Sequence, residues 1–262
     1  MKPIAIPLTN GATKFSDKVR HQKNGFLCLT VGLRDYNKPP SWWNIMINWE
    51  KIDTVLLDMD GTLLDLHYDN HFWMTHLPER YADIQKISIA ESERLLYKHI
   101  LELEGTLNWY CLDYWSESLG IEVLALKKET RHKIKQRPHV DDFLKALKNN
   151  QKKVYLVTNS HPAGIELKFN QTNIEPFFDG IISSHQFQSP KEDQKFWLAL
   201  ADYISFDPER TLFIDDNVTV LNAAVEFGIK HILGIHQPDS QKQRVLSDVP
   251  AIHHFDEIMM GL

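Results

Sequence analysis

The chain has 262 residues, of which 43% are hydrophobic and 24% are charged, a mixture that is ordinary for a globular protein. Its formal net charge of -6 argues against a nucleic-acid-binding protein, which usually carries a basic surface. No apolar run approaches the length of a membrane span, and the N-terminus does not read as a signal peptide. We therefore expect a cytoplasmic protein that binds neither nucleic acid nor membrane, and the sequence does not indicate its oligomeric state.

Residues 1–45 differ from the rest of the chain because lysine and arginine outnumber aspartate and hydrophobic periodicity is weak. Three interpretations remain open: a basic tail that contacts a partner, a poorly ordered extension, or a mis-assigned start, with Met46 as the true first residue. The two cysteines, Cys28 and Cys111, are too few for a disulfide framework, and we expect free thiols.

The predicted elements begin at residues 54–58, a continuous apolar run that is typical of a parallel strand buried on both faces. Residues 69–136 are rich in helix formers and contain few helix breakers, which predicts a long helical stretch. From Pro138 onward, helix and strand patterns alternate. The expected helices are at 140–147, from Pro162, around 196–200 and at 217–227, and the expected strands are at 154–157, 181–182, 211–214 and 232–233.

Strands that are separated by single helices predict an α/β fold with a doubly wound, Rossmann-like parallel sheet. The helical stretch then becomes a small all-helical cap inserted after the first strand. We divide the chain into an N-terminal extension (1–45), a core formed by 46–66 and 138–262, and a cap (67–137).

Polar residues follow three of the predicted strands, at 58–62, 158–160 and 215–217, and Lys191 precedes a predicted helix. Ligands of open parallel sheets bind beyond the carboxyl ends of the strands. Four aspartates meeting at that edge would repel one another unless a cation joined them, and Mg²⁺ prefers such oxygen ligands. Each residue alone is better explained as a turn, cap or surface residue, but the ordered combination predicts a phosphate and magnesium site.

The sequence DMDGTLLD at 58–65 resembles the first motif loop of the haloacid-dehalogenase-like hydrolases. TNS at 158–160, Lys191 and FIDDN at 213–217 resemble the second, third and fourth loops, in the same order. On these four motifs, the chain is similar to this superfamily over roughly residues 50 to 260.

This resemblance implies that Asp58 is the nucleophile, which forms an aspartyl-phosphate, and that Asp60 is the general acid and base. It also implies that Thr158, Asn159 and Lys191 hold the phosphoryl oxygens.

A bound Mg²⁺ is implied as well, held by Asp58, the backbone carbonyl of Asp60 and Asp216, with Asp215 binding directly or through water. Asp60 favours phosphate ester hydrolysis over dehalogenation, because dehalogenases of the superfamily lack the second aspartate. We see no additional basic cluster of the kind that a mutase needs for a bisphosphate.

One position departs from the family pattern. Glu192 follows Lys191, where many relatives have proline. Its carboxylate would either weaken the hold of Lys191 on phosphate or point to solvent, and we expect the second.

Longer stretches, at 53–73, 106–120, 190–197 and 209–216, resemble the bacterial GMP/IMP nucleotidases within the superfamily. They imply a phosphomonoester hydrolase, a 5′-nucleotidase for small purine mononucleotides. An alternative is a phosphatase for sugar phosphates or phosphoglycolate on the same core. An alternative of another class is a non-catalytic binding or regulatory protein that retains the fold.

The predicted cap is rich in aromatic residues, of which we expect one or two to stack on a purine and most to pack in the cap. These are Tyr68, Phe72, Trp73, Trp109, Tyr110, Tyr114 and Trp115. Asn108 and Asp113 are candidates for reading the edge of the base. The histidines at 67, 71 and 76, and the pair at 253–254, are better explained as exposed or packed residues than as zinc ligands.

Overall fold

The computed structural model describes residues 47–262, so the hypotheses about residues 1–45 and Met46 lie outside the described part of the chain. All six strands are parallel and form one sheet in the order β3-β2-β1-β4-β5-β6. The strands are β1 (Thr54–Leu57), β2 (Lys153–Thr158), β3 (Gly180–Ser183), β4 (Thr211–Asp215), β5 (His231–Ile235) and β6 (Ala251–Ile252). The predicted doubly wound sheet is confirmed, and only the short β6 was not expected.

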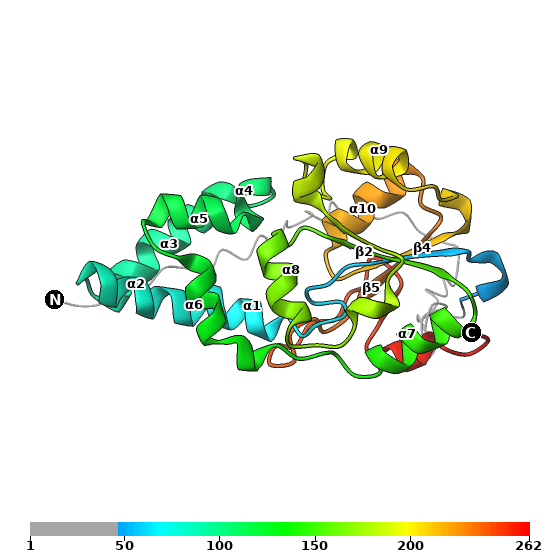
Figure 1. The fold of residues 1–262 in the computed structure, drawn as a ribbon, viewed down its shortest axis with the longest axis horizontal. Helices are drawn as coiled ribbons and strands as arrows, with labels where there is room; N and C mark the ends of the chain where they lie inside the picture. The colour runs from blue at the N-terminus through cyan, green and yellow to red at the C-terminus, as the bar shows by residue number, and fades with distance from the viewer. Residues whose placement is uncertain (1–46) are drawn as a thin grey trace, which may run out of the picture. The chain divides into compact units, whose positions relative to one another are not determined.

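Four helices cover the two faces of the sheet (Figure 1). They are α7 (Val140–Asn149), α8 (Pro162–Phe169), α9 (Gln194–Tyr203) and α10 (Val218–Phe227). Side chains of a strand alternate between faces. Val55 and Leu57 therefore pack in the apolar cluster that contains α7 and α8 residues, whereas Leu56 packs in the cluster of α9 and α10. This two-sided burial explains why β1 reads as an uninterrupted apolar run.

The winding direction of the sheet changes between β1 and β4. The chain runs outward from β1 through β2 to β3, and then crosses to β4 on the other side of β1. Such a switch point leaves a crevice at the carboxyl ends of the strands. Leu57 is aligned with Ile214, and the amide of Asp58 donates to the Ile214 carbonyl at 3.0 Å. Asp58 and Asp215 therefore leave the sheet side by side.

The segment between β1 and α7 forms the helical cap (Figure 1). Its helices are α1 (His67–His71), a π-helical turn (Phe72–His76), α2 (Leu77–Gln85), α3 (Ile89–Leu103), α4 (Leu107–Tyr110), α5 (Leu112–Leu119) and α6 (Val123–Glu129). The expected long helical stretch is thus divided into short helices, because left-handed residues such as Lys86 and Gly120 end them. The cap has its own apolar core around Phe72 and Trp115.

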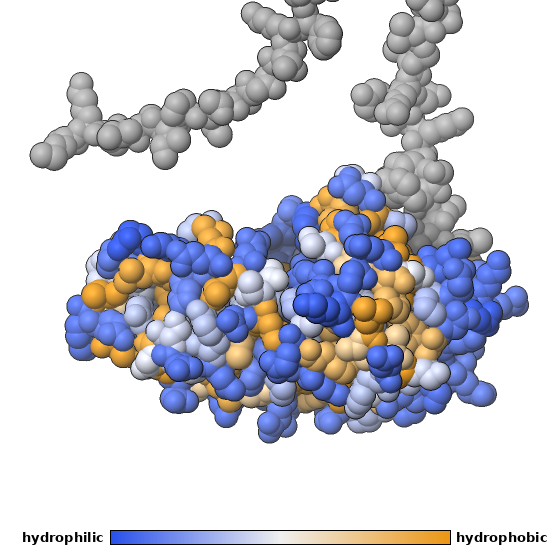
Figure 2. Space-filling view, turned by 90° about the horizontal axis from the view of Figure 1, so that it is seen from above, coloured by the Kyte–Doolittle hydropathy of each residue, from blue (hydrophilic) through white to orange (hydrophobic). Residues whose placement is uncertain are grey.

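The surface of the described residues is mainly hydrophilic on the face shown in Figure 2, with apolar residues in small separate patches over cap and core. No helix in residues 47–262 is both long enough and apolar enough to cross a membrane.

Candidate active site

The loop after β1 makes a tight turn at Gly61, which has a φ of 84°. A Cβ at this position would lie 2.7 Å from Cγ of Asp216 and 2.9 Å from Cβ of Pro238. Glycine is therefore needed both for the left-handed backbone and for the close approach. The turn holds the loop of Asp58 and Asp60 directly against the loop that follows β4.

Lys191 lies between the carboxylates at the ends of β1 and β4. Its Nζ is 2.5 Å from Oδ1 of Asp58 and 2.7 Å from Oδ2 of Asp215, and it also donates to the carbonyl of Val157 at 3.0 Å. All three charged side chains are buried. The sequence-predicted lysine and two of the predicted aspartates therefore meet in one hydrogen-bonded group.

Asp216 completes what we call the acidic cluster, formed by Asp58, Asp215, Asp216 and Lys191. The three aspartates each place one carboxylate oxygen within 4.8 Å of the others. Three carboxylates face the ammonium of Lys191 and the guanidinium of Arg244, which lies 3.8 Å from Asp216, so a formal charge of about -1 remains in a largely buried place. An oxygen donor set with excess negative charge fits a hard divalent cation such as Mg²⁺.

Burial and mutual repulsion disfavour full ionisation of the acidic cluster. Burial raises the pKa of Asp58 to about 6, against the attraction of Lys191 and with added repulsion from Asp215. Burial, followed by repulsion from Asp215 and Asp58, raises the pKa of Asp216 well above its usual range. A bound cation would reverse both effects, because it favours the charged carboxylates.

Asp60 belongs to a second charged group, the bridging cluster, formed by Asp60, Asp69, Lys127 and Lys168. Lys168 Nζ lies 2.6 Å from the Asp60 carboxylate and 3.0 Å from Oδ2 of Asp69, while Lys127 Nζ lies 2.7 Å from Oδ1 of Asp69. Ser160 also donates to Asp60, at 3.0 Å. Burial raises the pKa of Asp60 to about 6 despite the attraction of Lys168, so its carboxyl can carry a proton near neutral pH.

The bridging cluster joins the cap to the core, because Asp69 is on α1 and Lys127 on α6, whereas Lys168 is on α8. Both lysines are buried. Sequence reasoning missed these three residues, since a single lysine or aspartate in a helix is usually solvated and no spacing marks it. Lys168 is the most important omission, because it contacts Asp60 directly.

The hydrogen bonds of Asn159 and Glu192 explain how a glutamate is accommodated directly after Lys191. Oδ1 of Asn159 accepts from the Lys191 amide at 2.9 Å, and its Nδ2 donates to Oε2 of Glu192, also at 2.9 Å. Oε1 of Glu192 accepts from the hydroxyl of Tyr110 in the cap at 2.7 Å. The expectation that Glu192 points to solvent is therefore wrong, because two donors hold its carboxylate between core and cap.

A cavity of about 520 Å³ lies over these groups, and all seven sequence-predicted site residues line it: Asp58, Asp60, Thr158, Asn159, Lys191, Asp215 and Asp216. Thr158 is buried, and its hydroxyl accepts from the Ser160 amide at 3.1 Å. Arg244, which the sequence did not mark, also lines the cavity and donates to the Asp216 carbonyl at 2.8 Å.

The cap contributes the aromatic part of the cavity wall through Trp73, Trp109 and Tyr110. The other expected aromatics are placed differently. Tyr68, Phe72 and Trp115 are buried in apolar clusters, and Tyr114 is hydrogen-bonded to His99. Asn108 and Asp113 are exposed and lie outside the lining, so the structure does not support them as base readers.

Two of the histidines considered as zinc ligands have carboxylate partners. His76 lies 2.9 Å from Glu129, and His67 lies 3.6 Å from Asp239. Within residues 47–262, two groups have three or more suitably spaced metal-ligand side chains: the aspartates of the acidic cluster, and Cys111 with His161 and His185.

Comparisons with known proteins agree with this geometry. A family model described as haloacid dehalogenase-like hydrolase matches residues 52–228. The chain is 43% identical over 197 residues to the GMP/IMP nucleotidase YrfG of Escherichia coli (strain K12), an alignment that covers 75% of this chain and 89% of that protein.

More distant relatives include a phosphorylated carbohydrates phosphatase of Thermotoga maritima, 23% identical over 221 residues, with 79% of this chain and 97% of that protein covered. Among solved structures, a HAD phosphatase from Thermococcus onnurineus is similar with a TM-score of 0.65 at 18% identity, covering 80% of this chain and 95% of that one. The similarity to the Thermococcus onnurineus structure demonstrates a shared fold.

Proposed function

The chain belongs to the haloacid dehalogenase-like hydrolases, and on that premise we propose that it is a Mg²⁺-dependent 5′-nucleotidase that hydrolyses purine mononucleotides such as GMP and IMP. The observation that carries this proposal is the convergence of Asp60 and the acidic cluster, including Asp58 and Lys191, on one cavity. The small-molecule substrate enters below the cap.

Asp58 is the nucleophile in this proposal. Its carboxylate attacks phosphorus, the bond between phosphorus and the nucleoside oxygen breaks, and an aspartyl-phosphate forms. Lys191, 2.5 Å from Asp58, provides a positive charge next to the phosphoryl oxygens during this transfer. Thr158 adds a buried hydroxyl at the same edge of the cavity. Asn159 acts chiefly by holding the backbone of Lys191, since both polar ends of its side chain already have protein partners.

Asp60 is the general acid and base. It gives its proton to the leaving nucleoside oxygen, and then takes a proton from the water that hydrolyses the aspartyl-phosphate. Its position two residues after Asp58 in the same loop places both carboxylates at the cavity. Lys168 and Ser160 hold the side chain of Asp60 in place.

The residues that would hold Mg²⁺ are Asp58, Asp216 and the backbone carbonyl of Asp60. Asp215 would take part through a water molecule, because Lys191 and the amide of Asn217 already donate to its two oxygens. When bound, the ion neutralises the charge that gathers between the carboxylates and the phosphoryl group.

The purine specificity rests on two observations. The 43% identity to a protein named GMP/IMP nucleotidase extends over 75% of this chain. The cavity wall from the cap also contains Trp73 and Trp109, whose flat rings suit stacking on a base. A volume of about 520 Å³ falls within the range of small-molecule sites.

The test is phosphate release from a panel of compounds: GMP, IMP, AMP, a pyrimidine mononucleotide, glucose 6-phosphate, phosphoglycolate and an aryl phosphate. We expect the highest kcat/KM for GMP and IMP, and loss of activity when EDTA removes the metal. Asp58→Asn serves as the inactive control.

Other results would select another function. Preference for a sugar phosphate or phosphoglycolate would favour the alternative that the Thermotoga maritima relative represents. A wild-type protein that binds nucleotide but releases no phosphate with Mg²⁺ would point to a binding or regulatory role. The cytoplasmic location inferred from the sequence stays a prediction.

A further inference from the structure

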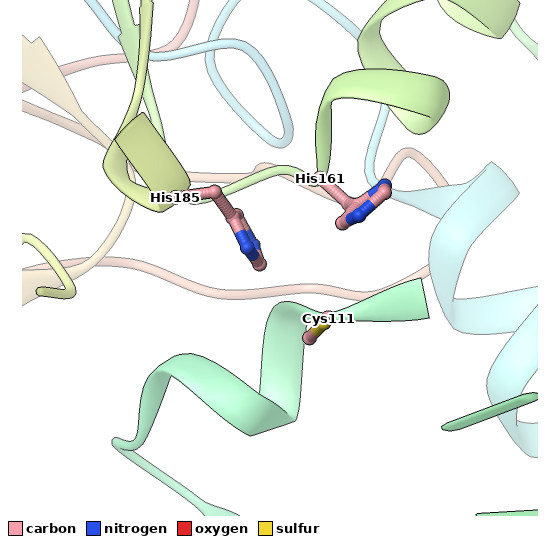
Figure 3. Close-up of side chains that lie close together, drawn as sticks. All are labelled: Cys111, His161 and His185. Atoms are coloured by element: carbon pink, nitrogen blue, oxygen red, sulfur yellow. The ribbon is translucent and has the colours of Figure 1, made fainter. Parts of the chain in front are cut away.

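Three side chains with affinity for soft metals meet beside the active-site cavity, outside the groups used above (Figure 3). Cys111 precedes α5 in the cap, His161 precedes α8, and His185 is in the short 3₁₀ helix after β3. The sulfur and one ring nitrogen of each histidine all lie within 4.8 Å of one another. They come from three separate segments of the chain, so their meeting depends on the docking of the cap on the core.

Two donor atoms of this group accept a backbone hydrogen bond that metal binding would replace: Sγ of Cys111 from the Tyr114 amide at 3.5 Å, and Nδ1 of His161 from the Ala163 amide at 3.3 Å. Cys111 forms no disulfide within the described residues. Nε2 of His185 is buried and has no hydrogen-bond partner, which is unusual for a buried polar atom.

The surroundings of His161 resemble those of metal-binding histidines in general. Its Nε2 lies 3.3 Å from a carboxylate oxygen of Asp113. A carboxylate beside the ring commonly orients a histidine ligand and makes it more basic. This contact also gives Asp113 a place in the structure, although it does not reach the substrate cavity.

We propose that Cys111, His161 and His185 form a binding site for a thiophilic transition-metal cation, with Zn²⁺ as the best-fitting ion. One sulfur and two imidazole nitrogens suit zinc and leave a fourth tetrahedral position for water, whereas Mg²⁺ requires oxygen ligands. Ligand atoms about 2.0–2.3 Å from zinc lie roughly 3.3–3.8 Å apart, so modest side-chain rotations close the site. Binding forms one zinc–sulfur and two zinc–nitrogen bonds, and the thiol proton passes to solvent.

The position of the site gives it a consequence for turnover, which rests on the proposed phosphatase function. Cys111 belongs to the cap and both histidines belong to the core. The neighbouring residue Leu112 and His161 itself line the substrate cavity. A zinc ion bound here ties the cap to the core beside the cavity, and therefore slows substrate entry and product release.

Cobalt binding to the full chain tests the site directly, without any assay of activity. Co²⁺ is added in the presence of excess Mg²⁺, which occupies the oxygen site, and the thiolate-to-cobalt charge-transfer absorption is recorded. The wild type should bind one thiolate-ligated Co²⁺. Cys28→Ser is the matched control, because it removes the other cysteine and should keep this absorption, whereas Cys111→Ser should lose it.

A second variant distinguishes loss of a metal ligand from a general disturbance of the fold. Without metal, His185→Gln should keep the thermal unfolding midpoint of the wild type. It should weaken Zn²⁺ binding about tenfold or more, because even loss of an outer partner of a metal ligand costs about 10–100-fold. Competition with a chelating dye measures this affinity. No charge-transfer absorption in the wild type, or equal absorption in Cys111→Ser, would overturn the site.

The inhibitory consequence has its own readout. At saturating Mg²⁺, Zn²⁺ should slow phosphate release by the wild type and Cys28→Ser more than by Cys111→Ser. Equal inhibition of all three proteins would contradict the cap-locking role. Because the cobalt experiment does not depend on turnover, failure of the proposed phosphatase function and failure of the metal site can be distinguished.

Discussion

The acidic cluster and the bridging cluster meet at the same loop after β1, but their charges differ. The acidic cluster has three carboxylates and one lysine, with Arg244 at 3.8 Å from Asp216, whereas the bridging cluster has two carboxylates and two lysines. Buried charges are tolerated when each has a partner, and an excess of one sign is not. The first cluster therefore favours an added cation, whereas the charges of the second cluster balance one another.

The difference assigns separate tasks to the two aspartates of the loop. Asp58 lies in the cluster with excess negative charge, where we propose that a cation and the phosphoryl group bind. Asp60 lies in the balanced cluster, where Lys168 holds it and links it through Asp69 to the cap. Charge balance thus separates the part of the site that binds from the part that positions.

The largest expected effect comes from Asp58→Asn in the acidic cluster. Loss of the proposed nucleophile should lower kcat for GMP by more than about 10³-fold. Stability without metal should stay the same or rise, because one charge of an uncompensated group is removed. Phosphate release and thermal unfolding measure the two effects, with exposed Asp142→Asn as the control. A clear loss of stability would contradict the excess of negative charge.

Breaking the bridging cluster should, in contrast, reduce the stability of the protein. Lys168→Met leaves Asp60 and Asp69 without their shared partner, and should reduce the free energy of unfolding by about 3–5 kcal/mol. Urea denaturation measures this free energy of unfolding, and the exposed-site variant Lys195→Met is the control. A loss below about 1 kcal/mol would show that the cluster does not hold cap and core together.

Magnesium should stabilise the protein through the acidic cluster. At a concentration of 100 times its Kd, the ion should add about 2.7 kcal/mol to the free energy of unfolding. Asp216→Asn should abolish most of this gain, whereas exposed Asp202→Asn should retain it. Thermal unfolding with Mg²⁺ and with EDTA provides the measurement, and an equal gain in both variants would place the ion elsewhere.

The smallest expected effect concerns the contact between cap and core at Glu192. Tyr110→Phe removes one hydrogen bond to that carboxylate, and should lower kcat/KM for GMP by at most about tenfold, which is about 1.4 kcal/mol. Tyr97→Phe is a matched control, because Tyr97 is an exposed tyrosine of the cap. A loss far above tenfold in Tyr110→Phe would mean that the hydroxyl touches substrate.

The core and the aspartates at the ends of β1 and β4 were predictable, because both follow from the pattern of buried parallel strands. Apolar runs mark β1, β2 and β4 as buried parallel strands, and parallel strands bring their carboxyl ends to one edge. The pattern therefore places Asp58 and Asp215 at one edge, and the structure shows that β1 and β4 are adjacent there. The motif residues that follow these strands are therefore brought to one edge by the sheet itself.

The bridging cluster was not predictable, because it depends on how the cap docks. Asp69 and Lys168 are far apart in sequence, and on their own helices they look like solvated residues. The same applies to Glu192, whose partner Tyr110 comes from the cap. The short β6 was missed because Ala251–Ile252 is too short to show a period.

Gly61 limits how this active site can change by mutation. A side chain there would strain the backbone and press on Asp216 and Pro238 at the same time. The carboxylate of Asp216 could not move away without leaving the acidic cluster. We therefore expect position 61 to accept no other residue in a saturation library selected for turnover, although the glycine takes no part in the chemistry.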